Sequence, residues 1–252
     1  MNAIAATSFS STRAYLLEAR YEFLRLLRTP SFSLPCLLFP PVLYLLFGVL
    51  LGGKGGPAAA QYMLAGYGVF GVMGVALFGF GVTVALDREQ GLLTLKRAQP
   101  MPPGAYLVAK MAMAVLFAAI ILLLLGALAI GVAGVRLSAL QWLALAATCL
   151  VGVLPFSALG LWLGTLVGGH GAPALVNLVY LPMAFLSGLW VPLTMLPGFL
   201  QAAAPAWPAY HLAQVAQKVV GMDEGRPLLL HIAVLVAITV VFFVLARRRL
   251  AR

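Results

Sequence analysis

Residues 105–131 read AYLVAKMAMAVLFAAIILLLLGALAIG, a run in which Lys110 is the only charged residue. A helix of about 20 apolar residues crosses the hydrocarbon core of a bilayer, so this run is long enough to span a membrane. Five further apolar runs lie at roughly 32–51, 62–86, 139–167, 173–192 and 228–246. The sequence therefore predicts an all-α integral membrane protein with six transmembrane helices.

The composition of the whole chain supports this prediction. Of the 252 residues, 63% are hydrophobic and 9% are charged. This composition excludes a soluble domain with a polar, solvent-exposed surface. The net charge of +10 does not indicate nucleic acid as a partner, because the basic residues lie in short segments between apolar runs. Membrane lipids are the partners that this pattern predicts.

The distribution of Lys and Arg predicts the orientation. An even number of spans puts both termini on one side, and basic residues are enriched on the cytoplasmic side. The side of the termini holds twelve basic residues: Arg13, Arg20, Arg25, Arg28, Arg88, Lys96, Arg97, Lys110, Arg247, Arg248, Arg249 and Arg252. The opposite side holds Lys54, Arg136, Lys218 and Arg226. Both termini are therefore expected in the cytoplasm.

Three segments follow from this arrangement: a cytoplasmic N-terminus (1–31), a membrane domain (32–246) and a basic cytoplasmic tail (247–252). Residues 13–28 predict an amphipathic helix, because their apolar side chains fall within an arc of about 120°. Glu18, Glu22 and Arg25 lie opposite that arc. We expect the helix at the inner interface, with its charged face toward a cytosolic partner. The alternative is a basic juxtamembrane helix that only sets topology.

Residues 193–212, between the fifth and sixth runs, are apolar but contain Pro197, Pro205 and Pro208, and Pro192 precedes them. Proline in the interior of a helix breaks or kinks it, so no single helix spans this region. We predict short re-entrant helices in the outer leaflet. An external loop on the headgroups is the alternative.

Glycines at every fourth position, Gly160, Gly164 and Gly168, predict a face for close helix packing. We favour packing within the chain over a dimer seam.

The sequence contains no pattern that predicts an enzyme, a metal site or a bound cofactor. No ionisable residue lies in mid-membrane, and His170, His211 and His231 fall in separate segments that we do not expect to converge on one metal. No nucleophile stands beside a base and an orienting acid. Any uphill transport must then be driven by another protein.

The connection 87–104 reads DREQGLLTLKRAQPMPPG and is the longest charged cytoplasmic stretch between runs. Gly91 permits a turn, residues 92–98 predict a short helix, and Pro100 lies among the prolines that stop it. A short helix joined rigidly to two spans can transmit force, so we interpret this connection as a coupling segment. A solvated loop that only sets topology is the alternative.

The same stretch resembles the cytoplasmic loop of ABC-2 type transporter permeases at Glu89, Gly91, Leu93, Pro100 and Lys110. Leu92 stands where that family usually has Thr. Residues 97–110 further resemble a branch of small bacterial permeases described as multidrug or antibiotic exporters. A second segment, 185–214, is similar to the family's fifth span and outer re-entrant helices at the positions Ser187, Gly188, Pro192, Pro197 and Tyr210.

The resemblance implies the membrane subunit of a bacterial ABC exporter in the cytoplasmic (inner) membrane. A second permease copy or a sister permease would complete a dimer, and separate ABC ATPase subunits would use ATP and Mg. The residues expected to couple to the ATPase are Asp87, Arg88, Glu89, Gly91, Leu95, Arg97 and Pro100, with Glu18 and Glu22. Ser187, Gly188, Pro192, Pro197 and Tyr210 would form an outer gate, and Tyr44, Phe47, Asn177, Tyr180 and Phe185 would line a translocation path.

We expect the exporter to move an amphipathic small molecule, a drug or a lipid. One alternative is a permease for lipid-linked glycans or polysaccharides, which requires a wide aromatic-lined path. Another is a non-transporting membrane sensor or assembly factor paired with a cytosolic partner.

Overall fold

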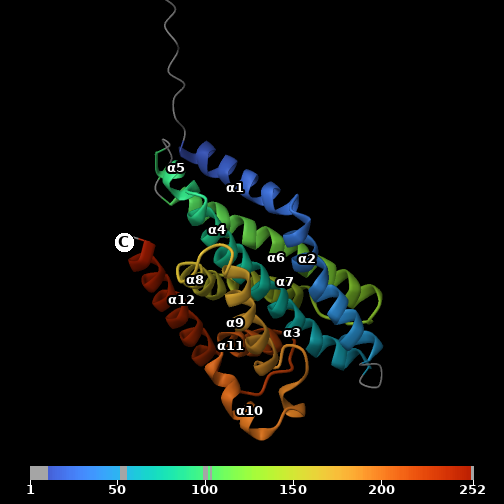
Figure 1. Ribbon diagram of the computed structural model, residues 1–252. Helices are drawn as coiled ribbons and strands as arrows, with labels where there is room; N and C mark the ends of the chain where they lie inside the picture. Colours follow the sequence, from blue (N-terminus) through green and yellow to red (C-terminus); the bar gives the residue numbers. More distant parts are fainter. Residues whose placement is uncertain (1–10, 52–55, 99–101, 103, 251–252) are drawn as a thin grey trace, which may run out of the picture.

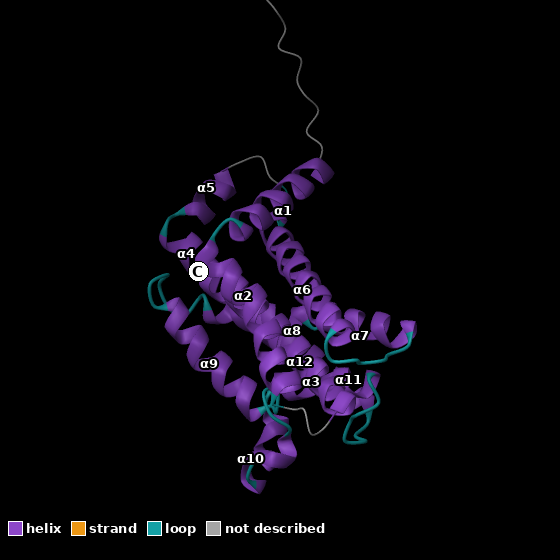
Figure 2. Cartoon of the chain, turned by 90° about the vertical axis from the view of Figure 1, so that its right-hand side faces the viewer, coloured by secondary structure: helices purple, strands orange, loops and turns teal. Residues whose placement is uncertain are grey.

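A computed structural model describes residues 11–51, 56–98, 102 and 104–250, and this part of the chain contains helices and no strand. Figure 2 shows the resulting all-helical bundle. Pro100 and the basic residues Lys54 and Arg252 lie outside the described residues, as does the side chain of Arg97.

Five continuous helical segments in the described part, which we call rods, are long and apolar enough to cross a membrane. The first joins α2 (Pro30–Leu43) to the π-helix η1 (Tyr44–Leu50), and the second joins α3 (Gly56–Leu77), η2 (Phe78–Val82) and α4 (Thr83–Glu89). The third is α6 (Ala105–Gly131). The fourth joins α7 (Ala139–Val151) to α8 (Val153–Leu163), and the fifth is α12 (Leu228–Leu250).

The predicted run 173–192 forms a shorter helix than expected. It gives α9 (Ala172–Leu186), whose 15 residues fall short of the roughly 20 that a span requires. Gly188 follows with φ +74, a conformation that ends a helix and that glycine adopts without strain. The apolar run continues beyond the end of α9. A sixth span therefore stays a prediction.

The rod α3–η2–α4 lies at the centre of the bundle, and α12 lies at its surface. In α3 every residue from Leu64 to Leu77 is buried, whereas α12 buries only His231 and Ala246. Glycines allow the close packing around the central rod: a Cβ added at Gly160 of α8 would lie 2.9 Å from the Leu77 carbonyl oxygen. The predicted glycine face therefore packs within the chain.

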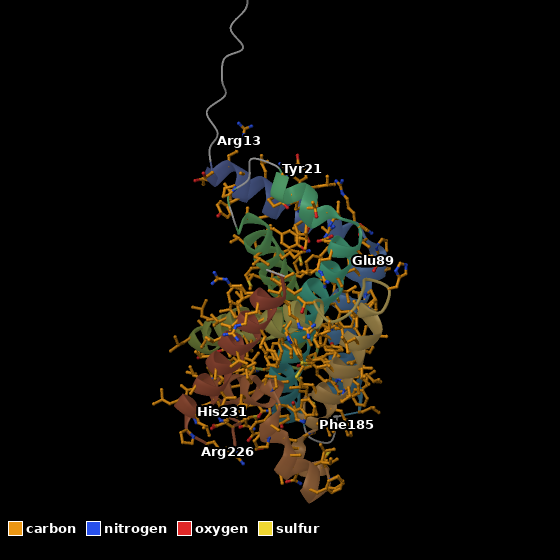
Figure 3. The ribbon with its side chains drawn as sticks, turned by 60° about the vertical axis from the view of Figure 1, so that its left-hand side comes forward. Arg13, Tyr21, Glu89, Phe185, Arg226 and His231 are labelled. Carbon is orange, nitrogen blue, oxygen red and sulfur yellow. The ribbon has the colours of Figure 1, made fainter. Side chains whose placement is uncertain are left out.

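Figure 1 shows α1 (Ser11–Leu27), α5 (Leu92–Ala98) and the end of α12 toward one end of the bundle. The short helices η3 (Leu193–Met195), α10 (Gly198–Ala203) and η4 (Ala204–Ala206) lie at the opposite end, and α11 (Pro208–Val219) then packs on α12 and α3. Side chains follow this division in Figure 3, with Tyr21 and Glu89 toward one end and Arg226 and His231 toward the other. Short helices in 193–212 are confirmed, and their entry into the bilayer stays a prediction.

Candidate functional site

Six side chains from three helices form what we call the ion cluster, at the end of the bundle near α5. They are Glu22 and Arg25 of α1, Thr83 and Asp87 of α4, and Tyr106 and Lys110 of α6.

Lys110 is the centre of the ion cluster and is fully buried. Its Nζ lies 2.7 Å from Oε1 of Glu22 and 3.0 Å from Oδ2 of Asp87, and it donates to Oγ1 of Thr83 at 2.6 Å. The ammonium group thus donates hydrogen bonds to Glu22 and Thr83 and forms an additional ion pair with Asp87. This explains how a charged side chain is accommodated at a site without water contact.

Arg25 and Tyr106 complete the cluster. Arg25 donates to Oε1 of Glu22 at 2.9 Å and to Oδ1 of Asp87 at 3.0 Å, and the Tyr106 hydroxyl donates to Oδ2 of Asp87 at 2.7 Å. Two carboxylates thus face two cations, and the cluster has no net charge. Removing one partner of such a buried pair leaves an uncompensated charge and costs about 3–5 kcal/mol. The cluster therefore fixes α1 to α4 and α6.

The expectation that the charged face of α1 points toward a cytosolic partner is wrong at Glu22, which packs on the protein and is only 5% exposed. Leu26 is buried beside it, whereas Leu16 and Tyr21 are 67% and 64% exposed. In a bilayer the apolar side chains can face lipid, so the polar side finds its partners inside the protein. Glu22 is therefore not available for the direct contact with a cytosolic partner that the sequence predicted.

The short helix α5 is joined to the same cluster. Lys96 forms an ion pair with Glu18 of α1, and its Nζ lies 5.1 Å from the centre of the Tyr106 ring. The predicted helix 92–98 and the turn before it are confirmed, with φ +72 at Gly91. Leu95 is 61% exposed on this helix. It is thus accessible at the surface, and its contact with an ATPase stays a prediction.

Arg88 and Glu89 connect α4 to the turn between α8 and α9. Arg88 donates to the Gly164 carbonyl oxygen at 2.7 Å, where it caps the end of α8. The Glu89 carboxylate accepts from the Gly169 amide and lies 2.6 Å from Nδ1 of His170. The two predicted coupling residues therefore hold two connections at this end of the bundle together, and their side chains have partners within the chain.

A second feature is a cavity of about 330 Å³ among α2, the central rod and α9, which we call the α2–α9 groove. Two of the predicted path residues, Asn177 and Tyr180, line it, beside Cys36 and Phe39 of α2 and Phe78 of η2. Asn177 is exposed and offers an amide to an otherwise mostly apolar surface. The groove can hold an amphipathic molecule with few polar groups.

The other predicted path residues lie elsewhere. Tyr44 is fully buried against the Tyr67 ring, Phe47 is half-buried on η1, and Phe185 is 39% exposed and contacts Trp190. The structure therefore brings Asn177 and Tyr180 to one groove, and it places Tyr44 in the core.

Phe70 of α3 joins these aromatic side chains and was missed from the sequence. Its ring stacks on Tyr180 with centroids 5.0 Å apart and meets Trp190 edge-on at 5.8 Å. Such pairs contribute about 0.5–1.5 kcal/mol each beyond the area they bury. Tyr67 and Phe70 share α3 with Gly66, Gly68 and Gly71, and this aromatic and glycine pattern was the available signal for a packing centre.

The predicted outer-gate residues shape the connection from α9 to α11. A Cβ at Gly188 would lie 2.6 Å from Cγ of Leu193, so the turn closes tightly beside the buried Ser187. Pro192 and Pro197 immediately precede η3 and α10. The Tyr210 hydroxyl donates to Oε2 of Glu224 at 2.8 Å.

Two histidines meet at this end, although the sequence placed them in separate segments. Nδ1 of His211 on α11 lies 2.9 Å from Nδ1 of His231 on α12, and Nε2 of His211 lies 2.9 Å from the Pro205 carbonyl oxygen. An Nε2–H that donates to Pro205 leaves Nδ1 of His211 to accept from His231. His170 is on the other side of the bundle, and among the described residues no three His, Cys, Asp or Glu side chains are grouped to hold a metal ion.

Comparison with known proteins agrees with this architecture. Residues 14–220 match the ABC-2 type transporter family. The chain is also 28% identical over 231 residues to the provisionally named transport permease YvfS of Bacillus subtilis (strain 168), a similarity that covers 90% of this chain and 92% of that protein. The matched region includes the ion cluster, α5 and the α2–α9 groove, and the chain therefore belongs to the ABC-2 type transporter family.

Proposed function

We propose that this chain is the transmembrane subunit of an ABC exporter that moves an amphipathic small molecule, a drug or a lipid, while a separate subunit hydrolyses ATP. The ion cluster is the observation that supports this most strongly. It joins α1, α4 and α6 through a neutral set of buried contacts beside α5. A push on α5 is thereby passed to two long helices rather than absorbed by a loop.

The proposed route of the force begins at the exposed Leu95. From α5 it passes through the Lys96–Glu18 pair to α1, and through Asp87 and Lys110 to α4 and α6. Arg88 and Glu89 extend the route to the α8–α9 turn and so to the start of α9. Because α9 borders the α2–α9 groove, movement of α5 changes the shape of the groove.

The proposal includes an orientation and an assembly. The end with α1 and α5 faces the bacterial cytoplasm, α9 and residues 187–192 make the sixth crossing, and two permease copies stand on two ATPase subunits. The α2–α9 groove then faces the second copy and receives the substrate. The exposed Asn177 within an apolar lining supports an amphipathic substrate.

The glycan alternative is less well supported. A path for a lipid-linked sugar chain needs a wide opening lined by aromatic rings, but Tyr44, Tyr67 and Phe70 are fully buried in the core. The α2–α9 groove of about 330 Å³ suits a small molecule.

The test is purification from cells in a mild detergent, identification of any co-purified ATPase, and reconstitution of the complex in vesicles. We expect an ABC ATPase, and ATP hydrolysis that rises with a fluorescent amphipathic cationic dye or a short-chain fluorescent phospholipid. Glu89→Lys should abolish this rise in a folded complex, and Asp223→Lys, a charge reversal at the opposite end, should not. If neither the dye nor the phospholipid changes the rate of ATP hydrolysis by a co-purified partner, the non-transporting sensor would be favoured.

A further inference from the structure

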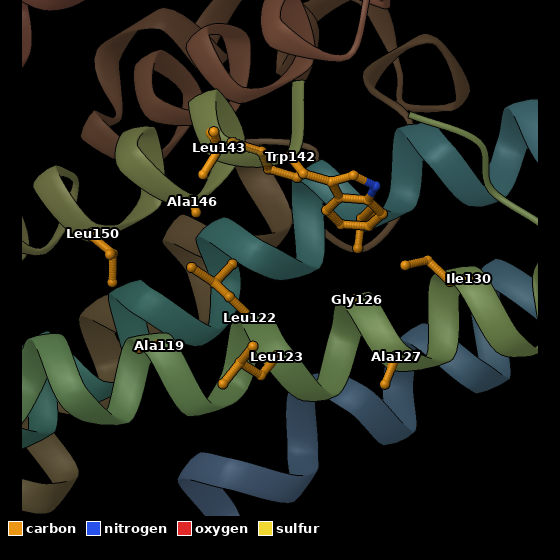
Figure 4. Close-up of a pocket in the computed structure, with 12 residues that line it drawn as sticks. Ala119, Leu122, Leu123, Gly126, Ala127, Ile130, Trp142, Leu143, Ala146 and Leu150 are labelled. Carbon is orange, nitrogen blue, oxygen red and sulfur yellow. The ribbon is translucent and has the colours of Figure 1, made fainter. Parts of the chain in front are cut away.

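A second groove, between α6 and α7, lies outside the site described above, and we call it the α6–α7 groove. It has a volume of about 430 Å³ and is lined by Leu122, Leu123 and Ala127 of α6 and by Trp142, Ala146 and Leu150 of α7. Figure 4 shows Leu122 pointing from α6 toward α7. All its lining side chains are apolar. Both helices belong to rods that are long enough to span a membrane, so the groove opens onto the hydrocarbon of the bilayer.

The length of α6 and the position of Trp142 indicate the depth of the groove in the bilayer. Its lining on α6 runs from Ala119 to Ile130, the half of the helix nearer the α6–α7 connection. Trp142 lies near the start of α7, and its ring is in ordinary contact distance, 3.5 Å, of a Cβ placed at Gly126. Tryptophan favours the depth of the headgroups. One end of the groove therefore opens near the interface, and the other end lies near mid-membrane.

The connection at the interfacial end carries a basic residue, Arg136. The connection 132–138 folds back on α6, with the Val135 amide donating to the Ala129 carbonyl at 2.9 Å, and the Ser138 hydroxyl caps α7. Arg136 lies between these fixed points and is exposed. Lys218 and Arg226 on the same side face Asp223 and Glu224, but among the described residues no acid pairs with Arg136.

From these observations we infer that the α6–α7 groove binds one glycerophospholipid, with an acyl chain in the groove and the headgroup phosphate on Arg136. Arg136 supplies the specificity for a phosphate headgroup that an apolar groove alone lacks. A guanidinium pairs with phosphate through two parallel hydrogen bonds. The lipid belongs to the leaflet on the side of the α6–α7 connection. Along the groove α6 and α7 leave an open space, and the acyl chain fills it. The inference does not depend on an ATPase or on the proposed direction of transport.

The test uses the purified full chain in vesicles of phosphatidylethanolamine and phosphatidylglycerol that contain a trace of phosphatidylglycerol with a diazirine in one acyl chain. Irradiation, digestion and mass spectrometry then map the labelled residues. We expect labels concentrated on 119–130 and 142–150, although the surface of α12 is more exposed. Arg136→Gln should lower that labelling about tenfold, the loss expected for one charge-assisted contact. Arg136→Lys should restore part of it.

Matched variants distinguish a site from ordinary surrounding lipid. Ala127→Trp fills the groove and should abolish the concentrated labelling, whereas Ala237→Trp, the same change on the exposed face of α12, should leave it intact. Arg226→Gln removes a positive charge from the same side and should also leave it intact. Labelling of α12 as strong as that of the groove, or a groove filled by a second copy of the chain in cross-linking, would overturn the inference.

Discussion

Substituting Lys110 by methionine tests the ion cluster directly. Methionine has nearly the same length and volume as lysine, so packing changes little and the lost charge dominates. Without Lys110, the carboxylates of Glu22 and Asp87 face only Arg25, and one negative charge stays buried without a partner. The free energy of unfolding should fall by about 3–5 kcal/mol.

The matched control is the same substitution at Lys218, which forms an ion pair with Asp223 at 2.6 Å but is 37% exposed. Such a surface pair contributes about 0–1 kcal/mol. For a chain of this size, 1 kcal/mol corresponds to about 2–4 °C in melting temperature. Lys110→Met should therefore lower the melting temperature by roughly 6–20 °C, and Lys218→Met by less than about 4 °C.

The fully buried thiol of Cys149 provides the assay. A thiol-reactive fluorophore labels it when the purified protein unfolds in detergent, and the labelling midpoint gives the melting temperature. A second change, Glu22→Gln, removes the excess negative charge and should recover more than half of the loss caused by Lys110→Met. Equal effects of Lys110→Met and Lys218→Met, or no recovery in the double variant, would refute this account of the cluster.

Three further predictions concern other parts of the chain. Leu95→Asp on α5 should leave the melting temperature almost unchanged, because Leu95 is exposed. It should lower dye-stimulated ATP hydrolysis by the complex, because we propose that Leu95 contacts the ATPase. Full stimulation of hydrolysis in this variant would exclude that role. Gly160→Ala should destabilise the protein by about 1–3 kcal/mol, since the new Cβ would press on the Leu77 backbone, whereas Gly131→Ala has open space and should cost far less. Burial lowers the pKa of His211 below its ordinary value of 6.5, so its stabilising contribution is present above that pH and is lost as the pH falls through the lowered pKa. Between pH 7 and 5 the melting temperature should fall less in His211→Gln than in the wild type or in His170→Gln, and equal decreases would contradict the prediction.

Much of the membrane domain could be predicted because each apolar run is a local property. Five runs gave rods long enough to span a bilayer, and the helix 92–98 followed from Gly91 and the prolines after it. The run 173–192 gave a helix shorter than a span, because hydropathy does not register the left-handed turn at Gly188 that follows α9. The number of crossings therefore depends on backbone conformation as well as on apolar length.

The contacts within the site were harder to predict because they join residues far apart in sequence. The helical pattern of α1 identified Glu22 as part of a polar face, but not that this face meets Lys110, 88 residues later. Periodicity gives two faces of a helix, and it does not say whether lipid or protein covers each one. The same reason explains why the contact between His211 and His231 was missed, since their segments come together only through the packing of α11 on α12.

The central claim is that this permease is driven by an ATPase subunit acting through α5 and the ion cluster. Vesicles that contain the purified chain alone, or the chain with its co-purified ATPase, should be compared for movement of the fluorescent amphipathic dye against its gradient on addition of ATP. The account predicts uphill movement only when the ATPase is present, and its loss in Glu89→Lys. Uphill movement by the chain alone would contradict it.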